Sequence, residues 1–478
     1  MLIRLIKVNL ESAIFNHKIT CTSYSSFFRD GLPAAASMGF FQLVVTITKI
    51  YVEEKDFRNI IFPQRASYSD TLLLFCGMFK GISIFTFAFL SSLTMYARQD
   101  SAITAPAGIQ LSNSHLRISL LTCGPGDEEI WEVFGHTALR VIDSTKHSDL
   151  VYNYGTFEYG PNFEIQFMRG KLLYCLSIDG YADFVAEYIT AKRKVEEQVL
   201  LLDEQQKEHI NSFLEWNAEP KNKYYKYDFF FDNCATRIRN IFPSPDVFGT
   251  TFTFGQVIPE RSQLTFRDII NLYFYRDHWT RMGVNLLLGS RIDKVMSNTD
   301  IMFLPDYLRD GIAGATVNGQ KIAGEKLLIL PGSAPQPAGI NEPFILTAVI
   351  AILTILGLST KRLRLLGRIM TSSLMLVTGL LGCLIFVMWF GTDHQGCSNN
   401  FNILWCLPTN IVLAFSSPKG KGKYALIAIV LLLLSILLHI LKVQGLTLLE
   451  LGPLFLALLF IYGTIYKRSI INTKKDDA

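Results

Sequence analysis

The sequence predicts two structural parts: an α+β globular domain, and after it an all-α bundle of membrane-spanning helices. Half of the 478 residues are hydrophobic and the mean hydropathy is +0.28, which is too apolar for an ordinary soluble protein. Residues 111–330 alternate short apolar runs with charged turns, as one globular domain does. Five apolar stretches follow residue 342, and their length indicates a membrane domain at 343–466.

Residues 78–97 have the pattern of a secretory signal peptide. A basic start at Lys80 is followed by a short apolar run and by Ala97, a small residue before a charged segment. A signal peptide that begins at Met78 makes residues 1–77 an upstream extension absent from the mature protein. The alternative is an N-terminal membrane anchor at about 72–97. Both interpretations place the following domain outside the cytoplasm.

Strands and helices are both expected in the domain at 111–330. Short apolar or alternating segments bounded by Gly, Asp or Ser predict strands at 118–121, 138–142, 150–154, 172–178 and 195–202. Helices are expected to begin after Asp203, Asn233 and Thr265, and the first and third of these residues have a capping-box partner three positions later. The third helix is predicted to carry Ile269, Leu272 and Tyr273 on one face.

A proline- and glycine-rich linker at 331–342 separates this domain from the apolar stretches at 343–359, 369–390, 401–416, 424–441 and 446–466. The first and third are close to the lower limit for crossing a bilayer, and could be re-entrant. Basic residues gather at 361–368, at 419–423 and in the tail at 467–478, after the first, third and fifth stretches. By the positive-inside rule these segments are cytoplasmic, so the globular domain and the loop 391–400 lie on the opposite side.

Charge and cysteine content exclude several classes of protein. The formal net charge is only +4, and the basic residues lie at the membrane borders, so no nucleic-acid partner is expected. The eight cysteines lack the paired spacing of a zinc site, so we expect no metal and no cofactor. Cys123 and Cys175 could form a disulfide in an oxidising compartment.

Two segments carry the residues of a cysteine-dependent enzyme. His136 follows Gly135 at the entrance of a predicted strand, where its ring can project into a cleft. Cys234 opens a predicted helix after Asp232 and Asn233, and a helix N-terminus favours the thiolate form of cysteine. The alternative is that both residues are structural, since no fixed spacing tests such a pair.

Five motifs resemble, in combination and order, the family of the Bacteroides-type lipoprotein N-acyltransferase (Lnb). They are Leu120-Leu121-Thr122-Cys123-Gly124-Pro125-Gly126, Phe134-Gly135-His136, Tyr152-Asn153-Tyr154-Gly155-Thr156-Phe157, Arg169-Gly170-Lys171-Leu172 and Asp232-Asn233-Cys234. The resemblance covers about 111–466. It implies a circularly permuted papain-like (NlpC/P60-like) periplasmic domain, on a multi-pass protein of the inner membrane.

The resemblance also implies an acyltransferase chemistry. Cys234 would attack a membrane phospholipid and hold its acyl chain as a thioester, with His136 as base. The α-amine of a diacylated lipoprotein would then accept the chain. Asn153 is the expected third catalytic residue, with Glu132 and Asp232 as other candidates.

Four further residues are expected near the substrate. Tyr227 could line the cleft. His394, Asn400 and Asn402, in the loop after the second apolar stretch, could meet the lipid headgroup or buttress the domain. The family tends to have Asn-Pro after this loop, and the sequence Cys406-Leu407-Pro408 departs from that pattern.

Two other functions fit the same residues. In a membrane-anchored hydrolase, a phospholipase or a cell-wall amidopeptidase, water would resolve the thioester. In a non-enzymatic membrane scaffold, Cys234 and His136 would be structural. Five apolar stretches favour a substrate that resides in the membrane.

Overall fold

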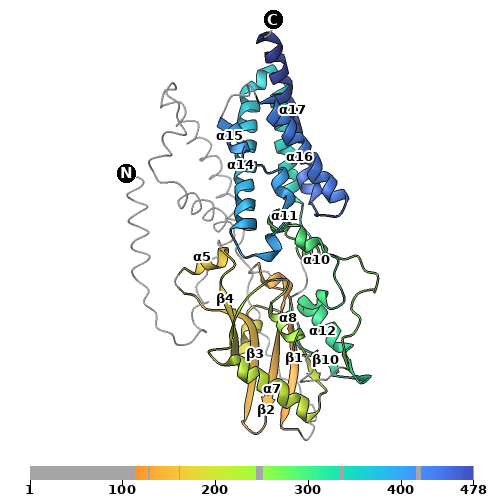
Figure 1. Ribbon diagram of the computed structural model, residues 1–478. Coiled ribbons are helices and arrows are strands. Elements are labelled where there is room, and N and C mark those ends of the chain that lie inside the picture. Colours follow the sequence, from red (N-terminus) through yellow and green to blue (C-terminus); the bar gives the residue numbers. More distant parts are fainter. Residues whose placement is uncertain are drawn as a thin grey trace, which may run out of the picture. The chain divides into compact units, whose positions relative to one another are not determined.

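The computed structural model describes residues 114–126, 130–160, 162–243, 251–333, 337–415 and 421–476 (Figure 1). The predicted extension at 1–77 and the signal peptide or anchor at 78–97 lie outside these residues. The described chain divides into a sheet domain, which ends at Leu330, and a helical part, which begins at Glu342.

A seven-stranded antiparallel sheet forms the centre of the sheet domain, in the order β10-β5-β1-β2-β3-β4-β6. Each of the five strands predicted from the sequence is present. These are β1 (Leu116–Cys123), β2 (His136–Asp143), β3 (Ser148–Phe157), β4 (Leu173–Gly180) and β5 (Val195–Leu200). The sequence did not predict the two edge strands, β6 (Tyr224–Lys226) and β10 (Ala323–Leu330). The α+β class of the domain is therefore confirmed.

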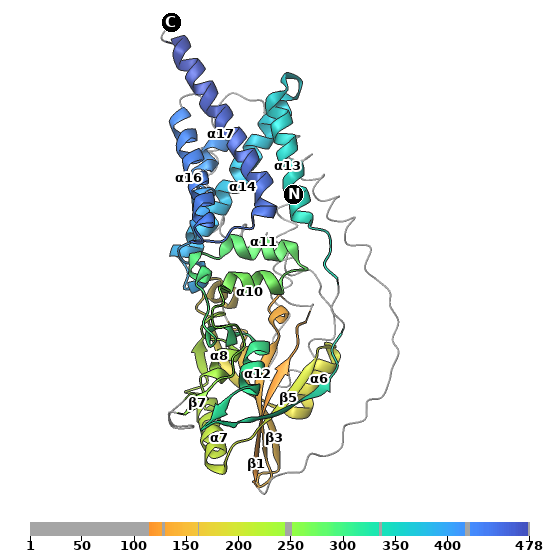
Figure 2. The ribbon, with the colours of Figure 1, turned by 90° about the vertical axis from the view of Figure 1, so that its right-hand side faces the viewer.

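Helices cover both faces of the sheet. On one side α7 (Glu204–Ala218), α8 (Cys234–Arg239) and α12 (Pro305–Ala313) pack on β1 and β2, and on the other α6 (Tyr181–Thr190) packs on β3 and β4 (Figure 2). Neighbouring strand residues alternate between the two cores: Leu120 and Leu139 join the first, Leu121 and Ala138 the second. The alternation follows from the two-residue period of a strand.

Side-chain caps start three helices where the sequence predicts them. Asp203, Asn233 and Thr265 each accept a hydrogen bond from the backbone N–H three residues later, and all three complete a capping box. The third helix, α10 (Phe266–Tyr273), buries Ile269 as expected. Leu272, predicted on the same face as Ile269, is 57% exposed, so that face is buried only in part.

Smaller elements complete the domain and link it to the helical part. They are η2 (Glu132–Phe134), α5 (Phe163–Met168), β7 (Phe252–Thr253), α11 (His278–Leu287), η3 (Ser290–Asp293), η4 (Asp300–Phe303), β8 (Thr316–Val317) and β9 (Gln320–Lys321).

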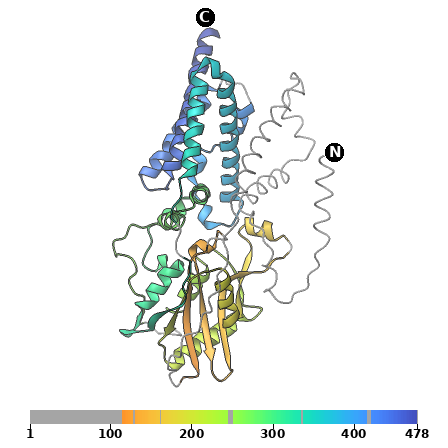
Figure 3. The ribbon, with the colours of Figure 1, turned by 180° about the vertical axis from the view of Figure 1, so that it is seen from behind.

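Four helices of the C-terminal part are long and apolar enough to cross a membrane, and they pack side by side (Figure 3). They are α13 (Glu342–Ser359), α14 (Arg364–Phe390), α16 (Gly422–Ile440) and α17 (Leu448–Asp476). We predicted five helices. Among the described residues, the third apolar stretch forms only η7 (Phe401–Leu404) and the six-residue α15 (Asn410–Phe415). Between them lies Pro408, which lacks a backbone N–H and disfavours helix in the residue before it.

This broken segment runs back along α14. A Cβ on Gly382 would lie 1.9 Å from the carbonyl oxygen of Cys406, so only glycine allows this close approach. Asn410 is fully buried, and its amide contacts Thr378, Tyr424 and Tyr462 through hydrogen bonds of 2.9–3.1 Å. A polar side chain that is buried among apolar helices requires such internal partners.

Two smaller helices join the sheet domain to the bundle. Arg281 of α11 donates to Glu450 at the start of α17 at 2.5 Å, and the Asn341 amide donates to the same carboxylate at 2.9 Å. Arg267 of α10 is buried and pairs with Asp293, which also accepts from the N–H of Gly445 in the bundle. The Glu450 carboxylate therefore holds α11 and the segment before α13 to the start of α17.

Candidate active site

Cys234 is the first residue of α8, and Asn233 fixes its position. The Asn233 side-chain oxygen accepts from the N–H of Thr236, and its amide donates to the carbonyls of Phe229 and Phe303 at 2.9 and 2.8 Å. The backbone N–H of Asn233 donates to the Thr236 hydroxyl at 2.7 Å. These bonds hold the sulfur at a helix N-terminus, as the sequence predicts.

His136 is the first residue of β2, and Gly135 before it has φ of +74°. A Cβ at Gly135 would lie 2.5 Å from the carbonyl oxygen of Cys123, so both the backbone angle and the space require glycine. This turn lets His136 enter the strand with its ring toward α8, where it hydrogen bonds with the Cys234 thiol. The two predicted residues are therefore brought together.

Asn153 of β3 supports the histidine from the other side. The His136 Nε2–H donates to the Asn153 side-chain oxygen. The Asn153 amide lies 3.5 Å from Asp179, which also accepts from the Ser177 hydroxyl at 3.2 Å. The order Cys234, His136, Asn153 is that of a Cys-His-Asn triad.

The electrostatics of the pair favour a thiolate and an imidazolium. Burial by itself would raise the pKa of Cys234, but the His136 charge, its hydrogen bond and the N–H groups of Thr137 and Ala235 outweigh burial and lower that pKa. Burial by itself would lower the pKa of His136, but Cys234 and the hydrogen bond that His136 donates to Asn153 outweigh burial and raise that pKa. Each residue therefore stabilises the charged form of the other.

The other cysteines of the domain lie in inert positions. Burial raises the pKa of Cys123 to about 12. Cys123 and Cys175 are both free, so the disulfide that the sequence left open does not form between them. They lie on β1 and β4, which β2 and β3 separate. Three strand spacings of about 4.8 Å exceed the reach of a disulfide, which requires Cα atoms within about 7 Å.

Cys234, His136 and Asn153 lie in one cavity of about 680 Å³, lined mainly by apolar side chains. Tyr227, predicted to line it, does so and stacks on Tyr174 at 4.2 Å between ring centroids. Phe229 and Phe230 also line it, whereas α10 and α11 supply Ile270 and Val284. The size is within the range of about 300–1,000 Å³ typical of ligand pockets.

The loop after α14 closes one wall of this cavity. Residues 393–397 line it, and His394 is among them as the sequence predicts. Asn400 and Asn402 do not line it. They are buried and donate to the carbonyls of Leu286 and Leu287, at the C-terminal end of α11. Of the two roles expected for these asparagines, the structure supports buttressing.

The comparisons with known proteins agree with this architecture. A family model described as the Lnb N-terminal periplasmic domain matches residues 108–257, and one described as the Lnb transmembrane domain matches 337–475. The chain belongs to the Lnb family. It is accordingly a membrane protein with a periplasmic domain, and membership suggests lipoprotein N-acylation. No curated protein matches the chain. No solved structure matches it either.

Two ion pairs of this Lnb-family chain decide the roles of the other carboxylates considered for the triad. Glu132 lines the cavity, but it accepts from Arg193 at 2.9 Å. Asp232 binds Arg237 in a bidentate pair at 2.5 and 2.7 Å, and Arg237 stacks on Tyr225. Each of these carboxylates is therefore engaged by an arginine, whereas the His136 ring bonds to Asn153. The sequence did not point to Arg193, because its partner lies 61 positions earlier.

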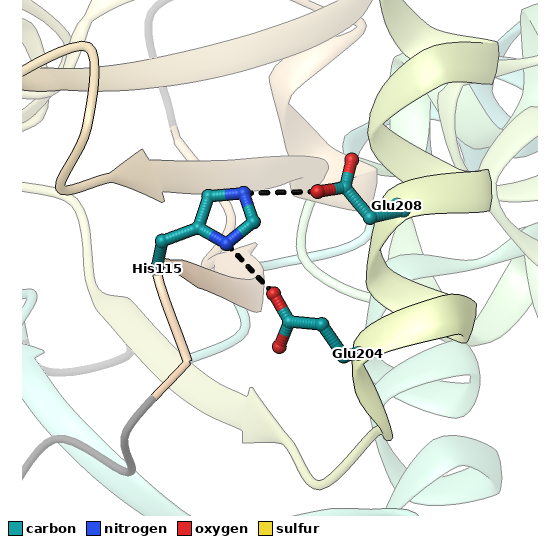
Figure 4. Close-up of side chains that lie close together, drawn as sticks. All are labelled: His115, Glu204 and Glu208. Atoms are coloured by element: carbon teal, nitrogen blue, oxygen red, sulfur yellow. Dashed lines mark ion pairs between the residues drawn. The ribbon is translucent and has the colours of Figure 1, made fainter.

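Among the described residues, one cluster of side chains of the kind that can bind a metal ion lies at the surface of the Lnb periplasmic domain. His115 lies between Glu204 and Glu208 of α7, and its two ring nitrogens lie 2.8 and 2.9 Å from their carboxylates (Figure 4). Both ring nitrogens of His115 therefore face a carboxylate. All three side chains are at least one-third exposed, so these contacts contribute little to the stability of the fold.

Proposed function

We propose that the chain transfers an acyl chain from a membrane phospholipid, through a thioester on Cys234, to the N-terminal amine of diacylated lipoproteins. The observation that carries this proposal is the thiolate and imidazolium pair, in an apolar cavity whose walls come from both the sheet domain and the membrane part. Family membership supports the same chemistry.

In the first half-reaction the Cys234 thiolate attacks the carbonyl carbon of the phospholipid ester. The C–O bond breaks, and the leaving alkoxide takes a proton from the His136 imidazolium, which yields a lysophospholipid and the thioester. The first N–H groups of a helix have no intrahelical partner, and that of Cys234 is a donor next to the sulfur. Such a donor to the oxyanion contributes roughly 3 kcal/mol.

In the second half-reaction the lipoprotein amine attacks the thioester carbonyl. The C–S bond breaks while His136 takes a proton from the amine, so the ion pair is restored and the product is an amide. Asn153 keeps the imidazole in the orientation that both steps require. The scheme uses no cofactor.

Two finer features belong to the same proposal. The Cys-His-Asn order, with cysteine at a helix start and histidine at a strand start, supports the permuted papain-like fold. The four long apolar helices, together with the periplasmic domain, support a place in the inner membrane.

Intact-mass analysis tests the proposal. Wild type, Cys234→Ser and Cys123→Ala proteins are incubated with phospholipid vesicles, and then with a synthetic diacylated lipopeptide that has a free N-terminus. We expect an acyl adduct on wild type and on Cys123→Ala, and transfer of that adduct to the lipopeptide amine. Cys234→Ser is expected to transfer nothing.

Two results would contradict the proposal. Free fatty acid without transfer to the amine would identify a membrane-bound lipase. An unmodified wild-type protein that forms neither product would favour the cell-wall enzyme or the scaffold.

A further inference from the structure

The segment from Tyr159 to Phe167 exposes apolar side chains at the mouth of the cavity. Helix α5 has the sequence Phe-Glu-Ile-Gln-Phe-Met, and none of its residues is buried. Ile165 and Phe167 are 42% and 48% exposed, and Tyr159 just before the helix is 69% exposed. A short helix that buries no apolar side chain gains little from folding unless something else covers it.

A second segment extends this surface. Ile130 is 46% exposed and Trp131 is 56% exposed. Both residues line the cavity that contains Cys234, as do Tyr159 and Phe167. We call these residues the α5 lip: Ile130, Trp131, Tyr159, Ile165 and Phe167. The lip is therefore continuous with the inner wall of the site.

Contacts with the loop after α14 fix the position of the α5 lip relative to the membrane part. The N–H of Asp393 donates to the carbonyl of Arg169 at 2.8 Å, and the His394 ring lies 3.1 Å from the carbonyls of Phe167 and Met168. A Cβ at Gly170 would lie 3.0 Å from the backbone nitrogen of His394, so the two segments are closely packed. Lys226 adds an ion pair to Asp393 at 2.7 Å.

The end of α14 marks the membrane border. Trp389 and Phe390 stack at 4.6 Å in its last turn, and Phe390 is 62% exposed, as aromatic residues at a membrane interface are. Asp393 is three residues further, so it lies at most about 11 Å from Phe390. The headgroup layer of one leaflet is about 5–8 Å thick. The lip and the adjoining Arg169 contact residues 393 and 394, and the lip is thus held close to the membrane interface.

Basic residues next to the lip fit the same surroundings. Arg169 and Lys171 are exposed and directly follow α5, and Lys226 is 54% exposed. Cations beside exposed aromatic and aliphatic residues are the pattern of a segment that lies in a membrane interface.

We propose that the α5 lip inserts into the outer leaflet of the membrane that the protein spans, and that an acyl chain enters the cavity between its side chains. Insertion of the lip is independent of the reaction catalysed, whereas the entry of an acyl donor rests on the proposed function. The lipid acyl chains cover the lip, and its two segments form the side of the cavity mouth that faces them.

Quenching by brominated phospholipid tests the insertion. The full chain is reconstituted into nanodiscs with plain or brominated acyl chains, as wild type, Trp131→Phe and Trp216→Phe. Trp216, which is 52% exposed on α7, is the matched control because it does not line the cavity. The emission of Trp131 is the difference between wild type and Trp131→Phe, and that of Trp216 is obtained in the same way. We expect brominated lipid to reduce the Trp131 emission strongly and to leave the Trp216 emission unchanged. Equal Trp131 fluorescence in both lipids would overturn the proposal.

A second experiment tests entry. Ile165→Asp and Phe167→Asp are expected to lower acylation of Cys234 by vesicle phospholipid about tenfold, because membrane binding scales with buried apolar area. Alkylation of Cys234 by a small water-soluble reagent is expected to stay at the wild-type rate, which shows that the site is folded. If acylation is unchanged in both variants, the chain enters elsewhere. If Trp131 is unquenched and only transfer to the lipopeptide falls, the lip is a protein-docking surface and the proposal is wrong.

Discussion

Cys234 and Cys123 have opposite chemistry although both face little solvent in the same domain. Cys123 is the last residue of β1, and burial raises its pKa to about 12. Cys234 is the first residue of α8, where a paired histidine and two backbone N–H groups overcome burial and lower its pKa. Burial alone makes a cysteine inert. A base and unpaired donors at a helix start favour the thiolate of a half-buried cysteine, which is the nucleophilic form.

Removing the two sulfurs should therefore have very different consequences for turnover. Cys234→Ala is expected to reduce acyl transfer by at least about a thousandfold, because the covalent step is lost. Cys123→Ala is expected to stay within about twofold of wild type, since its thiol lies outside the proposed reaction. Release of lysophospholipid from vesicles measures both. Comparable losses of acyl transfer in the two variants would contradict the different roles assigned to the two cysteines.

The contribution of His136 can be separated from that of the helix start. His136→Ala removes the charge and the hydrogen bond that lower the pKa of Cys234, so this pKa should rise toward the value of 9.0 for an ordinary thiol. Alkylation at pH 7 should fall by about tenfold for each unit of that rise. Alkylation rates between pH 5 and 10 give the midpoint. An unchanged midpoint would assign the whole effect to α8.

Asn153 should influence the reaction through His136, and its substitution should reduce activity less than that of Cys234. Its hydrogen bond raises the pKa of His136, so Asn153→Ala should move the alkaline limb of the pH profile to lower pH. A hydrogen bond to a charged group contributes about 1.5–3 kcal/mol, so kcat/KM should fall about ten- to a hundredfold. Asn153→Asp should move the same limb to higher pH, because a carboxylate favours the imidazolium. If Asn153→Ala and Asn153→Asp moved the alkaline limb in the same direction, this role of Asn153 would be wrong.

The smallest effect is expected on stability. Cys123→Ala removes one buried sulfur from the core around Leu121 and Phe184, and should lower the free energy of unfolding by about 1 kcal/mol. Thermal unfolding in detergent, followed beside the wild type, measures the change. A loss several times larger would mean that Cys123 supports the active-site turn at Gly135.

The parts of the fold that depend on local pattern were predictable. Asp203, Asn233 and Thr265 mark helix starts because a short polar side chain satisfies a backbone N–H close in sequence. The strands of the sheet alternate or are apolar over a few residues. The edge strand β10 was missed because its outward residues include Glu325 and Lys326, which resemble a charged turn.

The parts that depend on distant contacts were not predictable. The third apolar stretch has enough hydrophobic residues for a span, but its break is stabilised by Asn410 partners on three other helices. Asn400 and Asn402 occur in a polar loop, and only the position of α11 shows that they cap its carbonyls. Of the predicted site, the arrangement of His136, Cys234 and Asn153 is reproduced, because His136 begins β2, Cys234 begins α8 and Asn153 lies on β3, the strand next to β2.

The shared wall of the cavity limits how this protein can be divided for study. A fragment that ends at Leu330 keeps Cys234, His136 and Asn153, the proposed catalytic residues, but lacks residues 393–397. Gly396 approaches the ring of Phe230 so closely that a Cβ there would lie 2.8 Å from it. Such a fragment would expose Phe230 and an open cleft to water. A water-soluble version of this enzyme would therefore have to carry the loop as a graft, or it would present half a binding site.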